Sequence, residues 1–265
     1  MFEITLHTLD EKRNGIIAFS VFILLFGVTM SAGYESIGTQ IDLDELLEDY
    51  PDFILDLFGK SVGSIGEFGG FYTLEYVQWV WFLIIPVYIG LFCSGFIAGE
   101  VENKTADTLL SYPVTRRKVI IEKYVAVLCV IGIINLMGVI ATYIGITAYG
   151  IDYQIKWMGI TMIQATPFLL VWAALFTLLS AMVADSKKAS TYAIVMVFFA
   201  YFIEVLSGLF GPAKIFAKIS PMHYFDPGLV MSKNIVSWEG MAVLIVACAL
   251  LLAMATYVFE KKDIL

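Results

Sequence analysis

Few side chains in this sequence could perform catalysis or bind a metal. The chain has two histidines, His7 and His223, and three cysteines, Cys93, Cys129 and Cys248. A zinc site needs three or four clustered ligands, and two distant histidines do not predict one. Each cysteine lies alone inside an apolar run, which is typical of small packed side chains rather than of a disulfide framework. We therefore expect no catalytic residue and no metal in this chain.

One stretch resembles a phosphate-binding loop but does not satisfy its pattern. Gly99-Glu-Val-Glu-Asn-Lys-Thr105 has the glycine and the lysine of such a loop, but Asn103 stands where a glycine must precede Lys104. A strand should also come before the loop, whereas a long apolar segment does. The sequence therefore predicts no nucleotide-binding site and no enzyme activity of its own.

The composition is that of a membrane protein. Hydrophobic residues make up 60% of the 265 residues and charged residues 15%, and the mean hydropathy is +0.84. Soluble domains carry about 45–50% apolar and about 25% charged residues. The excess apolar surface cannot be buried in a core of this size, so lipid must cover part of it. The sequence has no basic tail that would indicate a nucleic-acid partner.

Six apolar stretches are long enough to cross about 30 Å of hydrocarbon, which takes about 20 helical residues. They are Gly15–Gly33, Tyr76–Ala98, Tyr124–Ala148, Gly159–Ala184, Ala189–Phe210 and Met241–Phe259. The first could instead be a cleaved signal peptide, but its apolar core is too long and acidic residues precede it. We predict an all-α polytopic membrane protein with six transmembrane helices, forming a single domain over residues 1–265.

Two groups of residues inside or beside these stretches suggest how the helices pack. Gln78, Asn135 and Gln164 could hydrogen-bond between helices. Trp79, Trp81, Trp157 and Trp238 fall near one set of helix ends, where an interfacial aromatic belt is expected.

The basic residues predict the orientation. Eleven of the 16 Lys and Arg residues fall on the side that carries both termini, and five on the other. Loops rich in Lys and Arg stay in the cytoplasm, so we expect a multi-pass protein of the plasma membrane with both termini cytoplasmic. The outer side then carries an acidic insertion, residues 34–75, and a second segment, residues 211–240. Apolar residues recur at helical spacing within the insertion and predict short amphipathic helices. We interpret the insertion as a solvated cap, with a cation-gathering vestibule as the alternative.

The cytoplasmic loop 99–118 is the most informative stretch of the sequence. Thr105 can cap a short surface helix, Asp107 suits its first turn, and Pro113 ends it. Thr115 can then cap the entry to the third membrane helix. Leu109 and Leu110 give this helix an apolar side. A solvated connector with basic anchors is the plainer interpretation of the same residues.

Four further charged residues are candidate site residues. Arg116, Arg117 and Lys118 fall at the expected phosphate layer, where they can bind lipid headgroups. Glu204 is the only acid inside a predicted span that is not at its cytoplasmic edge. Charges inside a span are candidates for function, so Glu204 could line a substrate pathway, or it could simply reach water.

The pattern E-x-E-x-K-T-x-D-x-L-L-S-x-P-V-x-R-x-x-V, from Glu100 to Val119, resembles the coupling region of permeases of the type 2 ABC exporter family. Residues 1–14, with Phe2, Leu6 and Leu9 on one helical face, resemble the elbow helix of that family. Ser220–Pro227 resembles its outer segment of short helices, and Phe259–Ile264 its C-terminal tail. The chain departs from the pattern at Lys104, where many members have glycine.

The resemblance implies the permease subunit of an ATP-driven ABC transporter that works as an exporter. A separate ATPase subunit would bind ATP and Mg, so this chain would hold no cofactor. Its partners would be that ATPase, a second permease copy, identical or related, and membrane lipid. The residues implied to contact the ATPase are Glu100, Glu102, Asp107, Leu109 and Leu110. An ion-coupled secondary transporter is the alternative, but the internal repeat and midplane charge pair typical of that class are not evident in the sequence.

Overall fold

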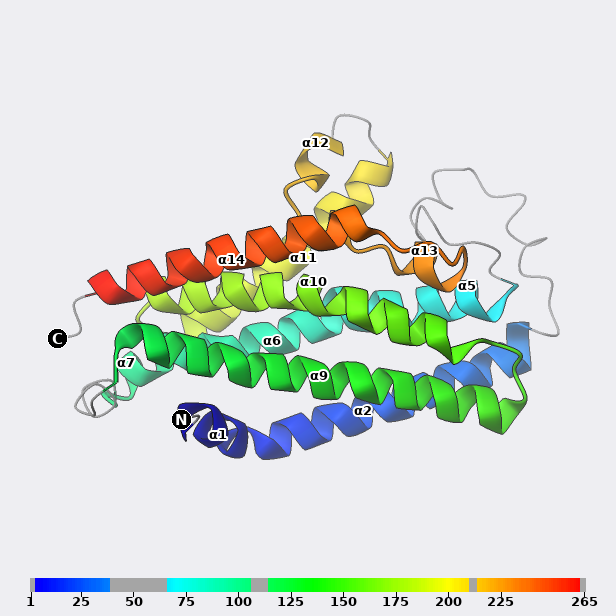
Figure 1. Cartoon of the computed structure of the whole chain (residues 1–265), viewed down its shortest axis with the longest axis horizontal. Coiled ribbons are helices and arrows are strands. Elements are labelled where there is room, and N and C mark those ends of the chain that lie inside the picture. Colours follow the sequence, from blue (N-terminus) through cyan, green and yellow to red (C-terminus); the bar gives the residue numbers. More distant parts are fainter. Residues whose placement is uncertain (1–2, 39–65, 106–113, 210–213, 263–265) are drawn as a thin grey trace.

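The computed structural model describes residues 3–38, 66–105, 114–209 and 214–262 of the chain. These residues are mostly helical, and no strand occurs among them (Figure 1). Six helices in this part are long and apolar enough to span a membrane, which confirms the predicted all-α polytopic fold. The spans are Arg13–Ser36, Phe68–Glu102, Arg116–Tyr149, Ile155–Met182, Ser186–Ser207 and Trp238–Lys261.

The regular spans are α2 (Arg13–Gly33), α9 (Arg116–Tyr149), α10 (Ile155–Met182), α11 (Ser186–Leu209) and α14 (Trp238–Lys261). Successive spans run in opposite directions (Figure 1). The short helix α1 (Glu3–Glu11) therefore lies at the same end of the bundle as the start of α9 and the end of α14. We call this end, at Glu11, Glu102, Arg116 and Lys261, the terminal end, and the other the opposite end.

The second span differs from the others because it alternates between α and π geometry. It consists of α5 (Phe68–Tyr72), η2 (Thr73–Gln78), η3 (Val80–Ile84), α6 (Ile85–Ser94), η4 (Gly95–Gly99) and α7 (Glu100–Glu102). In its most apolar 18-residue window 67% of the residues are buried, against 17% in the corresponding windows of α11 and α14. The irregular span is thus a packed centre of the bundle, while few residues of α11 and α14 are fully buried.

Large aromatic side chains fill the core between these spans. Six of them, Tyr72, Tyr76, Trp81, Phe168, Trp172 and Phe176, are fully buried. The Trp81 indole donates a hydrogen bond to Asn135 Oδ1 of α9 at 2.9 Å, and Asn135 in turn donates to the Met162 carbonyl of α10 at 3.1 Å. Asn135 therefore bonds between helices as predicted. The interfacial position predicted for Trp81 is wrong, because its ring is in the core, where the Asn135 amide satisfies its N–H.

The predicted outer segment 211–240 forms three short helices in its described part: α12 (Lys214–Ala217), η6 (Pro221–Tyr224) and α13 (Pro227–Met231). Ser220 and Asp226 accept hydrogen bonds from the first turns of η6 and α13, and a proline follows each of them. Serine and aspartate are favoured as N-caps, and proline is favoured as the first residue of the helix that follows. Between the two helices, Phe225 is buried and stacks on Phe168 at 4.9 Å, which packs the segment onto the bundle.

The ends of the predicted acidic insertion 34–75 belong to the spans. Tyr34–Gly38 continues the first span as a π-helix, η1, and Phe68–Glu75 begins the second. The predicted amphipathic helices between them fall on residues 39–65, which lie outside the described residues.

Candidate functional site at the terminal end

The structure describes two of the five residues predicted to contact an ATPase. Glu100 and Glu102 form α7, the last turn of the second span. Asp107, Leu109 and Leu110 lie outside the described residues. The site can therefore be built from the two ends of loop 99–118 and from the helices that contact them.

A buried lysine joins the two ends of this loop. Thr115 caps α9 by accepting a hydrogen bond from the Lys118 N–H, as predicted, so the helix begins at Arg116, before the apolar stretch that starts at Tyr124. Lys123 consequently lies two turns inside the helix, where its side chain is 8% exposed. Its ammonium contacts Glu100 Oε1 at 2.7 Å and donates to the Phe96 carbonyl at 2.6 Å. Together the carboxylate and the carbonyl compensate the buried charge.

Serine side chains of two other spans bind the π-helical turn η4. The N–H groups of Ile97 and Ala98 donate to Ser180 Oγ of α10 at 3.0 and 3.1 Å. Ser180 Oγ also donates to the Ser94 carbonyl at 2.9 Å, and Ser190 of α11 donates to Ser94 Oγ at 2.8 Å. Backbone groups of the irregular turn are thus satisfied by neighbouring helices.

Glu102 joins the second span to the start of α11. Its Oε2 atom accepts hydrogen bonds from both the backbone N–H, at 3.0 Å, and the hydroxyl of Ser186. Asp185 accepts from the N–H groups of Lys187 and Lys188 at 2.9 and 3.0 Å. Both carboxylates therefore lie at the N-terminus of α11, where they satisfy free N–H groups and oppose the helix dipole.

Two basic residues join the remaining spans by capping helix C-termini. Arg116, at the start of α9, donates to the carbonyls of Phe259, at 2.8 Å, and of Lys262 at the end of α14. Lys262 donates in turn to the carbonyls of Ala181 and Val183 at the end of α10, at 2.9 and 2.8 Å. The last carbonyls of a helix lack helical partners and attract cations. Partial burial lowers the pKa of the Lys262 ammonium.

These contacts bear on the residues predicted to bind lipid phosphates. Arg116 contacts protein carbonyls, whereas Arg117 and Lys118 are exposed. Phosphate binding by the three residues stays a prediction. The exposed Lys118 ammonium also lies 3.7 Å from Glu122 Oε1.

The predicted elbow helix is also bonded to α9. The Ile4 N–H in the first turn of α1 donates to Glu122 Oε2 at 3.0 Å, and the Thr5 hydroxyl donates to the Glu122 carbonyl at 2.8 Å. Thr5 and Thr8 are buried, whereas Leu6 is 66% exposed. The side of α1 that packs on the bundle is therefore its threonine side, and Leu6 points away from the bundle.

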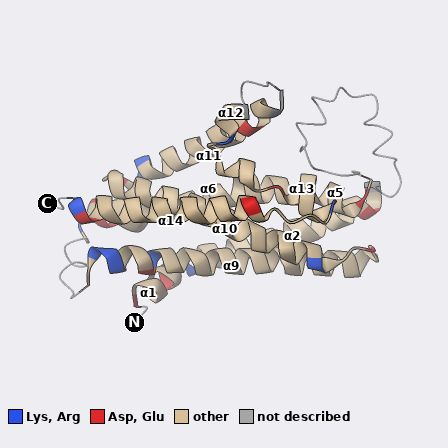
Figure 2. Ribbon diagram, turned by 45° about the horizontal axis from the view of Figure 1, so that its top comes forward, with Lys and Arg blue, Asp and Glu red and all other residues tan. Residues whose placement is uncertain are grey.

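Together these contacts form a network that we call the clamp. Its members are Glu100, Glu102, Arg116, Glu122, Lys123, Ser180, Ser186 and Lys262. Figure 2 shows charged residues on the ribbon mainly near helix ends, including those of the terminal end. The clamp connects α1, α7, α9, α10, α11 and α14. Through it, the described ends of loop 99–118 are linked, directly or through another residue, to every span except α2. That span follows α1 directly.

Sequence reasoning identifies only part of the clamp. It uses Lys123 and Lys262 as basic residues that orient the protein, and it does not single out Ser180 or Ser186. The one sequence feature that could have indicated the clamp is Glu122-Lys123, a charged pair directly before an apolar run. Its partners come from distant parts of the chain and cannot be paired from one sequence.

Glu204 lies away from the clamp, on the part of α11 nearer the opposite end. Its Oε1 atom is 3.8 Å from His223 Nδ1 of η6, and the two side chains are 22% and 34% exposed. The predicted pathway residue thus faces the outer segment 211–240.

Comparison with known proteins gives one result that covers this whole arrangement. A family model described as "ABC-2 family transporter protein" matches residues 9–264, which include all six spans and the entire clamp. No curated protein matches the sequence.

Proposed function

Because the chain belongs to the ABC-2 family of transporter proteins, we propose that it is the permease subunit of an exporter driven by a separate ATPase. The ATPase binds ATP and Mg and docks at the terminal end, on loop 99–118. The terminal end, with both chain termini, faces the cytoplasm of the plasma membrane. Two permease copies, identical or related, present two such loops to two ATPase subunits. This chain contributes the translocation path and no catalysis.

The observation that carries this proposal is the clamp. Loop 99–118 connects α7 to α9, and the contact of Lys123 with Glu100 bonds these two helices to each other. A push on the loop therefore moves both helices together. Packed interiors transmit displacement instead of absorbing it. Glu102 passes the displacement to α11, and Arg116 passes it through α14 to α10.

The π-helical turn η4 gives the displacement a way into the core. Single π turns are often found at functional sites, and η4 lies directly between α6 and the loop. Ser180 bonds to its backbone, so a shift of α7 is felt by α10 as well as along the second span. The second span is largely buried, and its movement must rearrange the helices around it.

The test is whether an ATPase depends on the loop for binding. The tagged chain would be purified from its own host in mild detergent, and partners identified by mass spectrometry. An ATP-binding-cassette protein should co-purify with the wild type. Leu109→Asp/Leu110→Asp should insert normally but lose it, because unpaired charges would be placed in an apolar contact. The matched variant Leu109→Met/Leu110→Met should keep it. Retention of the ATPase by the aspartate variant would contradict the proposal.

A further inference from the structure

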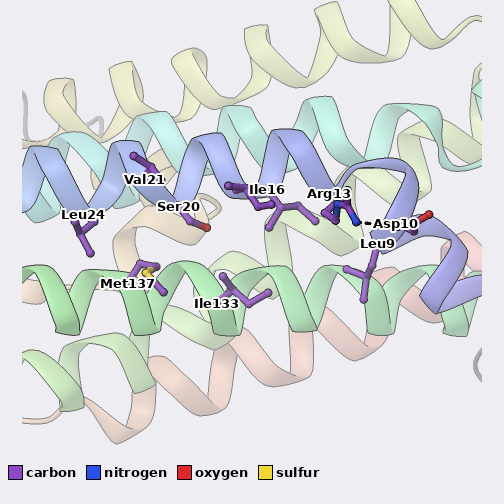
Figure 3. A pocket seen from close by; sticks show the side chains of 10 residues that line it. Leu9, Asp10, Arg13, Ile16, Ser20, Val21, Leu24, Ile133 and Met137 are labelled. Carbon is purple, nitrogen blue, oxygen red and sulfur yellow. Dashed lines mark ion pairs between the residues drawn. The ribbon is translucent and has the colours of Figure 1, made fainter.

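A groove of about 600 Å³ runs along the outside of the bundle where α1, α2 and α9 meet (Figure 3). Its walls are mostly aliphatic. They include Leu9 of α1, Ile16, Ser20 and Leu24 of α2, and Ile133 and Met137 of α9. The groove has the volume of a small-molecule site. It opens along helices that span the membrane, so a molecule of the membrane can enter it sideways.

One end of the groove carries an accessible positive charge. Figure 3 shows Arg13 and Asp10 together at this end, beyond the apolar side chains. Their charged atoms are 4.0 Å apart, and their side chains are 68% and 81% exposed. An ion pair at that distance and exposure is weak. The guanidinium of Arg13 therefore keeps donors for an anion, and its planar fork suits the oxygens of a phosphate.

The length of the groove matches one leaflet of a bilayer. From Arg13 to Leu24 the helix rises about 16 Å, at about 1.5 Å per residue. Half of a hydrocarbon core of roughly 30 Å is about 15 Å. A lipid whose phosphate contacts Arg13, near the terminal end, would thus lay its acyl chain along the apolar walls as far as the bilayer centre.

Ser20 makes room in the middle of the groove. Its side chain is small and 8% exposed, and its hydroxyl makes no hydrogen bond to the described residues. Elsewhere on the first span the hydroxyls of Thr29 and Ser31 bond to carbonyls four residues earlier, at 2.8 and 3.1 Å. Ser20 forms part of the groove wall, with its hydroxyl buried there (Figure 3). A larger side chain here would fill the space between α2 and α9.

We propose that the groove binds one phospholipid of the leaflet at the terminal end, with its acyl chain between α2 and α9 and its phosphate at Arg13. The bound lipid fills the space between α1 and the first two regular spans, and so supports the elbow helix that Glu122 bonds to α9. This lipid-binding proposal depends on membrane embedding and not on coupling to an ATPase. It would therefore hold even if the chain bound no ATPase.

The experiment uses the full-length purified chain and a phosphatidylglycerol with a diazirine near the end of one acyl chain. After illumination, mass spectrometry maps the lipid adducts. Wild type should carry adducts on α2 and on the α9 segment around Ile133 and Met137. Ser20→Leu should lower this labelling at least tenfold, whereas Ser20→Ala, which keeps the room, should not. Arg13→Gln should lower it severalfold, because the phosphate loses its partner.

Two controls distinguish loss of the groove from nonspecific labelling and from misfolding. Leu250→Phe adds bulk to an exposed position of α14 and should leave groove labelling unchanged. Thermal unfolding should show that Ser20→Leu is folded. Unchanged labelling in folded Ser20→Leu would overturn the proposal. So would a disulfide between Ile17→Cys residues of two copies in membranes, because a second copy would then cover the groove.

Discussion

The two ends of the bundle differ in the side chains that join their helices, which are often charged at one end and aromatic and neutral at the other. At the terminal end, charged side chains and serines bond to backbone groups of neighbouring helices, as in the contacts of Lys123 and Arg116. Toward the opposite end, α2 packs on the second span and α9 through aromatic and small residues. Tyr72 and Tyr76 donate to the Gly27 and Ile23 carbonyls, at 3.2 and 2.8 Å, and their ring centroids are 4.8 Å apart.

This difference affects how easily the helices can move relative to each other. Charge-assisted hydrogen bonds are directional and strong, so helices joined by them move as one body. Aromatic packing is less directional, and packed helices can slide past each other by small shear movements. Under the proposed function, the terminal end would receive a displacement from the ATPase and the opposite end would respond to it.

The largest effect is expected from Lys123→Met. The substitution leaves Glu100 without its ammonium partner. Breaking a fully buried pair costs about 3–5 kcal/mol, and we expect about 2 kcal/mol here because Glu100 is 28% exposed. Transport should be lost while the ATPase still binds. Lys123→Met/Glu100→Gln should recover stability in thermal unfolding but not transport, and a single variant as stable as wild type would argue against the clamp.

Gly27→Ala tests the opposite half of the bundle. A Cβ at Gly27 would lie 2.8 Å from the Ala141 Cβ and 2.8 Å from the Tyr76 ring. Overpacking of this kind costs about 1–3 kcal/mol. The melting temperature should fall, while ATP hydrolysis stays coupled to transport in the protein that remains folded. Uncoupled hydrolysis with normal stability would show that coupling does not depend on the terminal end alone.

Glu102→Gln should have a smaller effect on stability and a visible one on coupling. Glu102 is exposed and Ser186 is half-buried, and solvent screening weakens a polar contact at such a surface position. The melting temperature should stay near that of wild type, and transport per ATP should fall because α11 is less firmly joined to α7. Glu239→Gln, in the first turn of α14 at the opposite end, is the matched control and should change neither quantity.

The smallest effect is expected from Glu204→Gln, which preserves size and polarity. The protein should stay folded and bound to its ATPase. If the carboxylate lines a substrate pathway, substrate-stimulated ATP hydrolysis in nanodiscs should change while basal hydrolysis does not. Identical rates in both assays would leave Glu204 as a partner of His223 in the outer segment and remove it from the pathway.

The sequence is sufficient to predict the spans, because 20 apolar residues in a row have few alternatives to a membrane helix. A local signal can also indicate where a helix begins, as Thr115 does for α9. It cannot show what lies against that helix, because the carbonyls of α14 that Arg116 binds come from a distant part of the chain. Trp81 reads as an interfacial residue because hydropathy cannot show that Asn135 meets its N–H in the core.

The most direct test of the central claim is whether ATP moves the opposite end through Lys123. Spin labels at Tyr149→Cys and Lys233→Cys, in a chain whose three cysteines are replaced, report distances there by pulsed electron resonance in the ATPase complex. Wild type should show a changed distance distribution when ATP and vanadate trap the complex. Lys123→Met should bind the ATPase and hydrolyse ATP without that change. A wild-type shift in Lys123→Met would contradict the account.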